Sequence, residues 1–369
     1  MSRFARNRRV FFIEEPLFEN VEPCMRSSVC SKTGVRVHTP VLPATCGHEQ
    51  MVALQTQLLE SLIQENGITN YIAWYYTPMA LEFSSSLLPK VTVYDCMDEL
   101  SAFSGAPPAM RTNEQRLFAR ADLVFTGGTS LFESKRKQHS SVHLFPSGVD
   151  VAHFSAARVI DREPNDQQSI PHPRIGYAGV IDERLDLALL AQAAGARPEW
   201  QFVLLGPVAK IDPATLPQAN NIHWLGMKQY ADLPAYFSGW DIGMLPFALN
   251  ESTRFISPTK TPEYLAAGLP VISTPISDVV TPYGVLGLVQ IVDGTRAFLR
   301  VAESLLASPL TSELLAKTDR FLSQSSWDKT WMEMSTLIEN QLTQQELALR
   351  TSSPSSSLTD ATGKGALRV

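Results

Sequence analysis

The chain has 369 residues, of which 44% are hydrophobic, 18% charged and 9% aromatic. This composition is typical of a folded globular protein and unlike that of a disordered or fibrous one. The formal net charge of -6 argues against a nucleic-acid-binding protein, which normally carries a basic surface. Because one core rarely grows to this length, we expect two domains of about 150 residues each.

The cysteines indicate a reducing compartment. Cys24, Cys30, Cys46 and Cys96 form no CxxC pair and are too few for a disulfide framework in a chain this long. We therefore expect free thiols and a cytoplasmic protein. Three of the cysteines lie near two histidines in the sequence, but the spacing matches no standard zinc motif, so we expect no metal site.

No apolar run approaches the roughly 20 residues that a membrane-spanning helix needs. The chain begins with a basic run of Arg3, Arg6, Arg8 and Arg9. We interpret it as the solvated end of a helix, with contact to an anionic membrane surface as the alternative. The sequence thus predicts a cytoplasmic protein whose closest approach to the membrane is peripheral association with its inner face.

Short β-branched runs alternate with helical patterns, which predicts parallel sheets covered by helices and an α/β fold. We expect a first domain over 1–155. Its strands are predicted at 9–13, 36–40, 71–75, 91–95, 123–126 and 142–145, and its helices at 49–65, 113–121 and 130–139.

Residues 156–173 are polar and irregular and are predicted to be a linker. A second doubly wound domain follows over 174–326. A helix at 327–346 is predicted to cross back, and 347–369 has too little apolar content to pack, so we expect disorder there. The strands of the second domain are predicted at 174–178, 201–205, 222–225, 242–245, 271–274 and 289–292, and its helices at 185–194, 233–237, 262–267, 295–307 and 311–322.

The most informative segment is ISPTKTPEYLAAGLPVIST, at 256–274. Pro258, Thr259 and Lys260 stand at the start of a predicted helix, whose free N–H groups and positive dipole end suit a diphosphate. One turn further, Glu263 can accept hydrogen bonds from the hydroxyl pair of a ribose. Alternatively, Glu263 only stabilises the helix start and Lys260 is solvated. The spacing ahead of a buried strand favours the binding interpretation.

This segment resembles the nucleotide-binding signature of the family 4 glycosyltransferases, which have the two-domain GT-B fold. The similarity is nearest to members that build bacterial polysaccharides and teichuronic acids. It extends to the segments FPSGVDVAHF at 145–154, RIGYAGVIDERLDL at 174–187, NIHWLG at 221–226 and WDIGMLPFALNESTRF at 240–255.

The resemblance implies a donor site for a nucleoside diphosphate sugar in the domain over 174–326. Glycines would let the backbone approach the ligand, and an arginine would bind the diphosphate bidentately. The implied donor-site residues are Gly179, Arg184, Gly226, Asn250, Pro258, Thr259, Lys260 and Glu263.

Catalytic residues are expected in VTVYDCMDELSAF, at 91–103, where a buried strand ends in carboxylates. Asp98 resembles the residue that faces the donor sugar in related enzymes. Glu99 could accept a proton from an acceptor hydroxyl. A helix N-cap with its electrostatic partner is the alternative role for Asp98.

Two departures from the family pattern stand out. Many members carry a second glutamate eight residues before Glu263, where this chain has Phe255. The family also begins with a strand, a glycine-rich loop and a long helix, whereas the first residues here resemble the end of that helix. We therefore expect the first strand and loop to be absent from this chain.

The implied reaction is transfer of a sugar from a nucleoside diphosphate sugar to a hydroxyl of a glycan or lipid-linked acceptor, with retained anomeric configuration. No cofactor or metal ion is expected, because Lys260, Arg184 and helix amides would stabilise the departing diphosphate. Two alternatives remain open at this point. One is a sugar-nucleotide epimerase of the same architecture, and the other is a catalytically impaired protein that only binds the nucleotide sugar.

Overall fold

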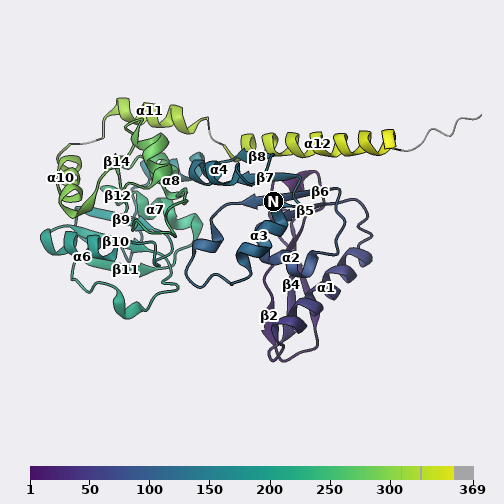
Figure 1. Cartoon of the computed structure of the whole chain (residues 1–369). Helices are drawn as coiled ribbons and strands as arrows, with labels where there is room; N and C mark the ends of the chain where they lie inside the picture. The colour runs from purple at the N-terminus through teal and green to yellow at the C-terminus, as the bar shows by residue number, and fades with distance from the viewer. Residues whose placement is uncertain (309, 325, 353–369) are drawn as a thin grey trace, which may run out of the picture.

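The computed structural model describes residues 1–308, 310–324 and 326–352. It has two lobes, the first holding strands β1 to β8 and the second holding β9 to β14 (Figure 1). A long helix, α12 (Trp327–Ser352), returns from the second lobe and runs along the first. The predicted helix ended at 346, so the helix is longer than expected; the rest of the predicted disordered tail, 353–369, lies outside the described residues.

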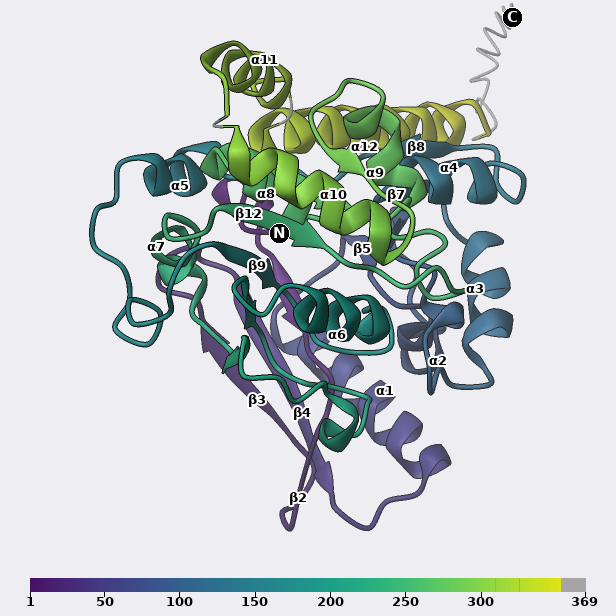
Figure 2. The same ribbon diagram turned by 90° about the vertical axis from the view of Figure 1, so that its left-hand side faces the viewer.

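The second lobe is built on one parallel six-stranded sheet in the order β11-β10-β9-β12-β13-β14. All six strands fall where the apolar runs predict them. Helices α6 and α10 lie over β9 and β12 in Figure 2. The strands are β9 (Arg174–Ala178), β10 (Gln201–Leu205), β11 (Ile222–Gly226), β12 (Ile242–Leu245), β13 (Val271–Ser273) and β14 (Gln290–Ile291).

The helices of the second lobe also follow the predicted pattern. They are α6 (Leu187–Ala196), α7 (Leu233–Phe237), α8 (Lys260–Ala267), α9 (Ser277–Val279), α10 (Gly294–Ala307) and α11 (Ser312–Leu322). Helices α6, α8 and α9 each connect a strand to its neighbour in the sheet, α7 crosses from β11 to β12, and α10 and α11 follow the last strand.

The first lobe confirms the α/β class but divides its strands between two four-stranded sheets. One sheet is parallel, in the order β5-β6-β7-β8. In the other, β1 and β2 run parallel to β4 and β3 runs antiparallel to it. The strands are β1 (Phe11–Ile13), β2 (Leu17–Glu19), β3 (Cys24–Val29), β4 (Arg36–Pro43), β5 (Ile72–Tyr75), β6 (Val91–Cys96), β7 (Leu123–Thr126) and β8 (Val142–Leu144).

Strands β2 and β3 were not predicted, for a physical reason. The sequence of β3, CMRSSV, is polar, and all its side chains except Met25 are exposed. It is held by backbone pairing to β4 and not by an apolar face, so it carries no hydrophobic signal. The helices of this lobe are α1 (His48–Glu65), α2 (Leu81–Ser84), α3 (Met110–Phe118), α4 (Thr129–Lys135) and α5 (Val151–Ser155).

The segment 156–173, predicted as a linker, packs on the second lobe. Gln167 is fully buried: its Nε2 donates to the Tyr236 carbonyl at 2.9 Å, and its Oε1 accepts from Trp240 Nε1 at 3.0 Å. Ile170 joins the hydrophobic core of the same lobe. Gln167 and Ile170 thus attach the segment to the second lobe, while most of its polar residues are exposed. Its role as a linker stays a prediction.

Helix α12 ties the two ends of the described chain together. Met334 and Ile338 are buried against β6 and β7 in a core with Phe125. The basic run at the start of the chain lies along this helix: Arg3 Nε and Arg6 Nη1 lie 2.9 and 3.0 Å from Asp328. Arg3, Arg6 and Arg8 are ion-paired within the molecule, and the run lies at a short 3-10 helix, Phe4–Arg6, that leads into β1. Contact of the run with a membrane surface stays a prediction. No helix within the described ranges is long and apolar enough to cross a membrane.

A buried ion cluster sits in the first lobe. Lys135, whose side chain is 2% exposed, lies 2.8 Å from both Glu99 Oε2 and Glu114 Oε1. The Tyr94 hydroxyl donates to Glu114 at 2.8 Å. Removing one partner from such a cluster leaves uncompensated buried charge, which costs more than the pairing itself contributes. Lys135 therefore joins α4 to the segment that follows β6.

We expect Lys135→Met to lower the free energy of unfolding by about 3–5 kcal/mol, because two buried carboxylates lose their counterion. Urea unfolding followed by circular dichroism measures the change. Lys137→Met is the matched control, since Lys137 is exposed two residues further along the chain. Equal losses in the two variants would contradict the assigned role of the cluster.

Candidate functional site

Three loops that follow neighbouring parallel strands form one surface of the second lobe. They follow β9, β12 and β13, which lie side by side in the sheet. The loops after β9 and β12 are paired with each other: the Ala248 N–H donates to the Arg184 carbonyl at 2.8 Å, and Asn250 Nδ2 donates to the Glu183 carbonyl at 3.0 Å. The carboxyl ends of such strands are the usual ligand-binding edge of an open parallel sheet.

Helix α8 begins at this surface with Lys260 and Glu263. Glu263 is only 9% exposed, and its Oε2 lies 3.5 Å from Lys260 Nζ. That oxygen has no hydrogen-bond partner among the described residues. Burial raises the pKa of the Glu263 carboxyl, and the charges of Lys260 and His153 lower it in part. A buried carboxylate oxygen without a donor is rare in folded proteins and indicates a place for a ligand.

His153 and Tyr230 complete the surroundings of Glu263, and sequence reasoning did not single them out. Their rings are stacked, with centroids 4.5 Å apart, and His153 Nε2 lies 3.0 Å from the Tyr230 carbonyl oxygen. His153 belongs to α5, which packs on α8. His153 lies within FPSGVDVAHF, one of the segments that resemble the family. That resemblance is the sequence signal that could have identified it as a site residue.

Helix α8 is fixed firmly against β9. The Tyr264 hydroxyl, fully buried, accepts from the Ala178 N–H at 2.7 Å. Gly268 ends the helix in the left-handed region at φ 82°, where other residues are strained. A side chain at Gly243 would collide with the Tyr264 ring at 2.8 Å. These contacts fix the position of the α8 N-terminus, and of Lys260 and Glu263 with it.

Arg184 is held by Asp182 in a bidentate ion pair. Its Nε and Nη2 donate to the two Asp182 oxygens at 2.9 and 2.6 Å, and Asp182 is 5% exposed. These bonds use one edge of the guanidinium and leave Nη1 outside the pair. The Arg184 charge also acts on Asp98 of the first lobe: burial raises the pKa of Asp98, and Arg184 lowers it in part. Across the boundary between the lobes, the Arg184 guanidinium lies over the ring of Phe103, 5.5 Å from its centroid, five residues after Asp98.

Glu99 lies in a different environment from Asp98. Its Oε2 is ion-paired with Lys135 at 2.8 Å, and its Oε1 accepts from Ser101 at 2.9 Å. Both carboxylate oxygens are therefore engaged within the first lobe. The general-base role predicted for Glu99 stays a prediction, and in this arrangement the carboxylate would first have to leave Lys135.

The glycines at the strand ends lie in a row across the sheet. The Gly179 N–H donates to Leu205, and the Gly206 N–H donates to the Gly226 carbonyl, both at 2.8 Å. A side chain at Gly206 would overlap the Gly179 carbonyl oxygen at 1.8 Å. Gly226, at φ 70°, ends β11 in a conformation that favours glycine. Because these three residues, which include the unpredicted Gly206, have no side chains, the backbone itself forms the surface of the candidate site here.

Other residues of the quoted segments have structural roles. Asn250 Oδ1 accepts from the Thr253 N–H at 3.1 Å, which shapes its own loop. Phe255 packs against the core of the first lobe. Gly148, in the segment FPSGVDVAHF, lies under Trp327, and a side chain there would be 2.9 Å from the indole. That glycine is required by close packing and not by a positive φ.

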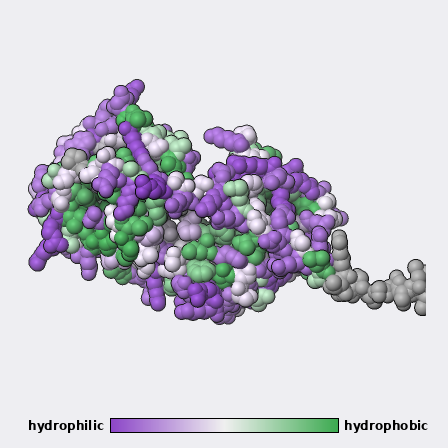
Figure 3. Space-filling view, turned by 90° about the horizontal axis from the view of Figure 1, so that it is seen from above, coloured by the Kyte–Doolittle hydropathy of each residue, from purple (hydrophilic) through white to green (hydrophobic). Residues whose placement is uncertain are grey.

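The two lobes touch beside this surface. The Asp278 carboxylate, at the start of α9, accepts from the Ser130 N–H of α4 at 2.9 Å. A side chain at Gly128 would meet Asp278 at 2.0 Å and Ser257 at 2.7 Å. Pro258 and Thr259, which follow Ser257, therefore lie at the boundary between the lobes. Figure 3 shows the two lobes meeting at a narrower waist.

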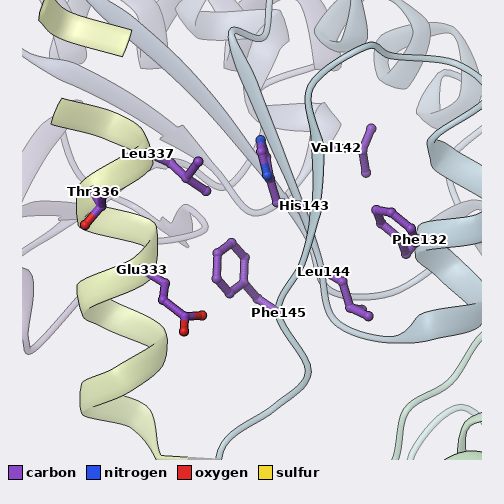
Figure 4. Close-up of a pocket in the computed structure, with 8 residues that line it drawn as sticks. All are labelled: Phe132, Val142, His143, Leu144, Phe145, Glu333, Thr336 and Leu337. Carbon is purple, nitrogen blue, oxygen red and sulfur yellow. The ribbon is translucent and has the colours of Figure 1, made fainter. Parts of the chain in front are cut away.

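No group of three or more His, Cys, Asp or Glu gathers as a metal site within 1–308, 310–324 and 326–352. A pocket of about 520 Å³ lies in the first lobe, away from the predicted site residues. Figure 4 shows it between β8 and α12, with His143 and Phe145 on one side and Glu333 and Leu337 on the other. None of the predicted site residues lines it, so it does not bear on the donor site.

Comparison with known proteins agrees with this geometry. Residues 172–308 match the family model described as "Glycosyl transferases group 1". The chain is 28% identical over 221 residues to TuaH of Bacillus subtilis, which carries the name of a teichuronic acid biosynthesis glycosyltransferase. The matched region covers 54% of each chain, so it spans about half the length of this curated relative.

Solved structures share the fold over most of the chain. Sucrose-phosphate synthase from Thermosynechococcus elongatus superposes with a TM-score of 0.69 at 15% identity, covering 92% of this chain and 90% of that one. The Anabaena protein HepE, solved in complex with UDP and glucose, gives 0.63 at 14% identity, covering 84% and 87%. At these identities the likeness establishes the fold. Residues 172–308 therefore form a glycosyl transferases group 1 domain, and the chain has the GT-B fold of glycosyltransferases.

Proposed function

We propose that the protein transfers a sugar from a nucleoside diphosphate sugar to a hydroxyl of a glycan or lipid-linked acceptor, with retained anomeric configuration and without a metal ion. The observation that carries this proposal is the buried Glu263 carboxylate at the start of α8, whose Oε2 is ion-paired with Lys260 at 3.5 Å but accepts no hydrogen bond from the described residues. It lies inside the segment that matches the glycosyltransferase family.

The start of α8 suits the diphosphate of the donor. Helix N-termini present N–H groups that lack an intrahelical acceptor and a positive dipole end. Lys260, 26% exposed at its side chain, adds a mobile positive charge. Glu263, one turn further, would accept hydrogen bonds from a ribose hydroxyl pair, as acidic residues do in dinucleotide sites. Pro258 and Thr259 would fix the conformation of the backbone segment that faces the phosphates.

Arg184 would stabilise the charge that develops on the departing diphosphate. Its ion pair with Asp182 orients the guanidinium, so little reorganisation is needed during the reaction. Asp98, near Arg184 on the opposite lobe, is the proposed acid or base that faces the donor sugar. Glu99 is ion-paired with Lys135. We propose that this pair fixes the position of the loop that carries Asp98.

The proposed setting is surface polysaccharide synthesis in the cytoplasm, with lipid-linked acceptors reached at the inner face of the membrane. Support for a role in polysaccharide synthesis comes from the name of the TuaH relative, a teichuronic acid biosynthesis glycosyltransferase, and support for the donor class from the UDP and glucose bound to HepE. The four cysteines are free thiols, which is typical of a reducing compartment.

We expect Glu263→Ala to weaken the binding of the nucleotide-sugar donor by about 1–3 kcal/mol, the value of lost hydrogen bonds to a charged group. Isothermal titration with a panel of UDP and GDP sugars measures this change. Glu251→Ala is the matched control, because Glu251 is an 81% exposed carboxylate on the loop before α8. If the Glu263→Ala and Glu251→Ala variants bind every donor with the affinity of the parent protein, Glu263 is not part of the donor site.

Turnover separates the proposed enzyme from the two alternatives. Release of nucleoside diphosphate that depends on added acceptor supports a transferase. Change of configuration in the sugar nucleotide without such release indicates an epimerase. Donor binding with neither reaction indicates a protein that binds the nucleotide sugar without acting on it.

We expect chelation by EDTA to leave the rate of sugar transfer unchanged, because Lys260, Arg184 and backbone amides supply the positive charge that balances the diphosphate. The rate of diphosphate release is measured before and after chelation, with added Mg²⁺ as the converse experiment. A rate that falls with EDTA and returns with Mg²⁺ would contradict the metal-independent mechanism.

A further inference from the structure

One residue of the second lobe has a backbone conformation that its side chain makes unfavourable. Lys210, in the loop after β10, has a φ of 60° and is the one non-glycine residue with a positive φ among residues 1–308, 310–324 and 326–352. Residues other than glycine, asparagine and aspartate rarely adopt this left-handed conformation, because their Cβ approaches the backbone too closely. Such strain gathers at functional sites, where a particular side chain is needed at one position.

The loop that carries Lys210 is fixed beside the candidate donor site. The Ala209 N–H donates to the Ile181 carbonyl at 3.0 Å, and the Ile181 N–H donates to the Pro207 carbonyl at 2.9 Å. Ile181 lies in the loop after β9, three residues before Arg184. Two backbone hydrogen bonds therefore join the strained loop to the loop that carries Arg184.

The side chains of Lys210 and Arg184 converge on one aromatic ring of the first lobe. The Lys210 ammonium nitrogen and the Arg184 guanidinium carbon each lie 5.5 Å from the centroid of the Phe103 ring. The next residue of the same segment is held as well, because the Ser104 N–H donates to Glu183 Oε1 at 3.3 Å. Both cations thus reach one small region at the boundary between the lobes.

The carboxylates near this region leave Lys210 without a counterion. Asp182 is occupied by its bidentate pair with Arg184. Asp212, two residues after Lys210, accepts from the Ala214 N–H at 2.9 Å. Lys210 forms no ion pair within the described part of the chain. An aromatic ring attracts an exposed cation only weakly, whereas a phosphate forms charge-assisted hydrogen bonds with it. An anion that reached both cations would therefore be the stronger partner.

We propose that Lys210 is a further cation of the donor site, whose Nζ binds the diphosphate of the nucleotide sugar together with Arg184. The inference rests on the proposed function, because it takes that diphosphate as the anion. The Phe103 ring holds the two cations until the phosphates replace it as their partner. A glycine at position 210 would adopt the same backbone without strain, so the charge of the lysine is what the strained position provides.

Isothermal titration of the full chain with UDP and with GDP, at low and at high salt, tests this role. Lys210→Met is expected to weaken binding of the nucleotide by roughly fivefold or more at low salt, and by less at high salt, where exposed charges are screened. Lys210→Arg keeps a positive charge and is expected to retain most of the affinity. Lys317→Met is the matched control, since Lys317 is an exposed lysine on α11 of the same lobe.

Two further variants separate a direct contact from a structural role. Lys210→Gly removes both the charge and the backbone strain, so it should unfold at the same or a higher temperature than Lys210→Met and yet bind the nucleotide as weakly. Phe103→Leu removes the ring but no charge, and it should bind the nucleotide at least as tightly as the parent protein does. If Phe103→Leu loses as much affinity as Lys210→Met, the effect arises from the contact between the lobes, and the proposal is overturned.

Unchanged nucleotide binding in Lys210→Met and Lys210→Gly would also overturn the proposal. Glu263→Ala, titrated alongside, keeps the two hypotheses apart. If Glu263→Ala weakens nucleotide binding and the Lys210 variants do not, only the role of Lys210 is wrong. If the parent protein binds neither UDP nor GDP, the proposed donor site falls and the role of Lys210 falls with it.

Discussion

The structure depends on one costly arrangement, the burial of the Glu263 carboxylate at the start of α8. Taking a carboxylate out of water costs several kcal/mol unless donors replace the lost hydration. Lys260 alone, at 3.5 Å, does not satisfy both oxygens. The Tyr264 hydroxyl and the left-handed Gly268 fix the position of the helix that carries this carboxylate. A ligand with a hydroxyl pair would supply the donors that the fold withholds.

The first lobe supports this site through charge as well as packing. Lys135 joins α4 to the loop after β6 through Glu99, and the start of the same helix meets Asp278 of the second lobe. One short helix therefore connects the buried ion cluster to the boundary between the lobes. A change at either end of α4 should therefore alter how the segment after β6, where Phe103 lies under the Arg184 guanidinium, sits against the second lobe.

Sequence patterns predicted the second sheet well because its strands β9, β10, β12 and β13 are fully buried and consist of short apolar runs, such as VIST at β13. They also placed Lys260 and Glu263 at a helix start. They missed β3, whose polar residues pair through the backbone, and the partners that meet only in three dimensions. Lys135 and Glu99 are such partners, as are Trp327 and Gly148. No local periodicity encodes contacts between segments so far apart in the chain.

The most direct test of the account is a crystal structure of the protein with a nucleoside diphosphate bound, tried with both UDP and GDP. We expect the two phosphates at the start of α8, within hydrogen-bond distance of Lys260 Nζ and the first backbone amides, and the ribose hydroxyls on Glu263. A nucleotide bound elsewhere, or one whose ribose makes no contact with Glu263, would contradict the central claim that this buried carboxylate is the donor site.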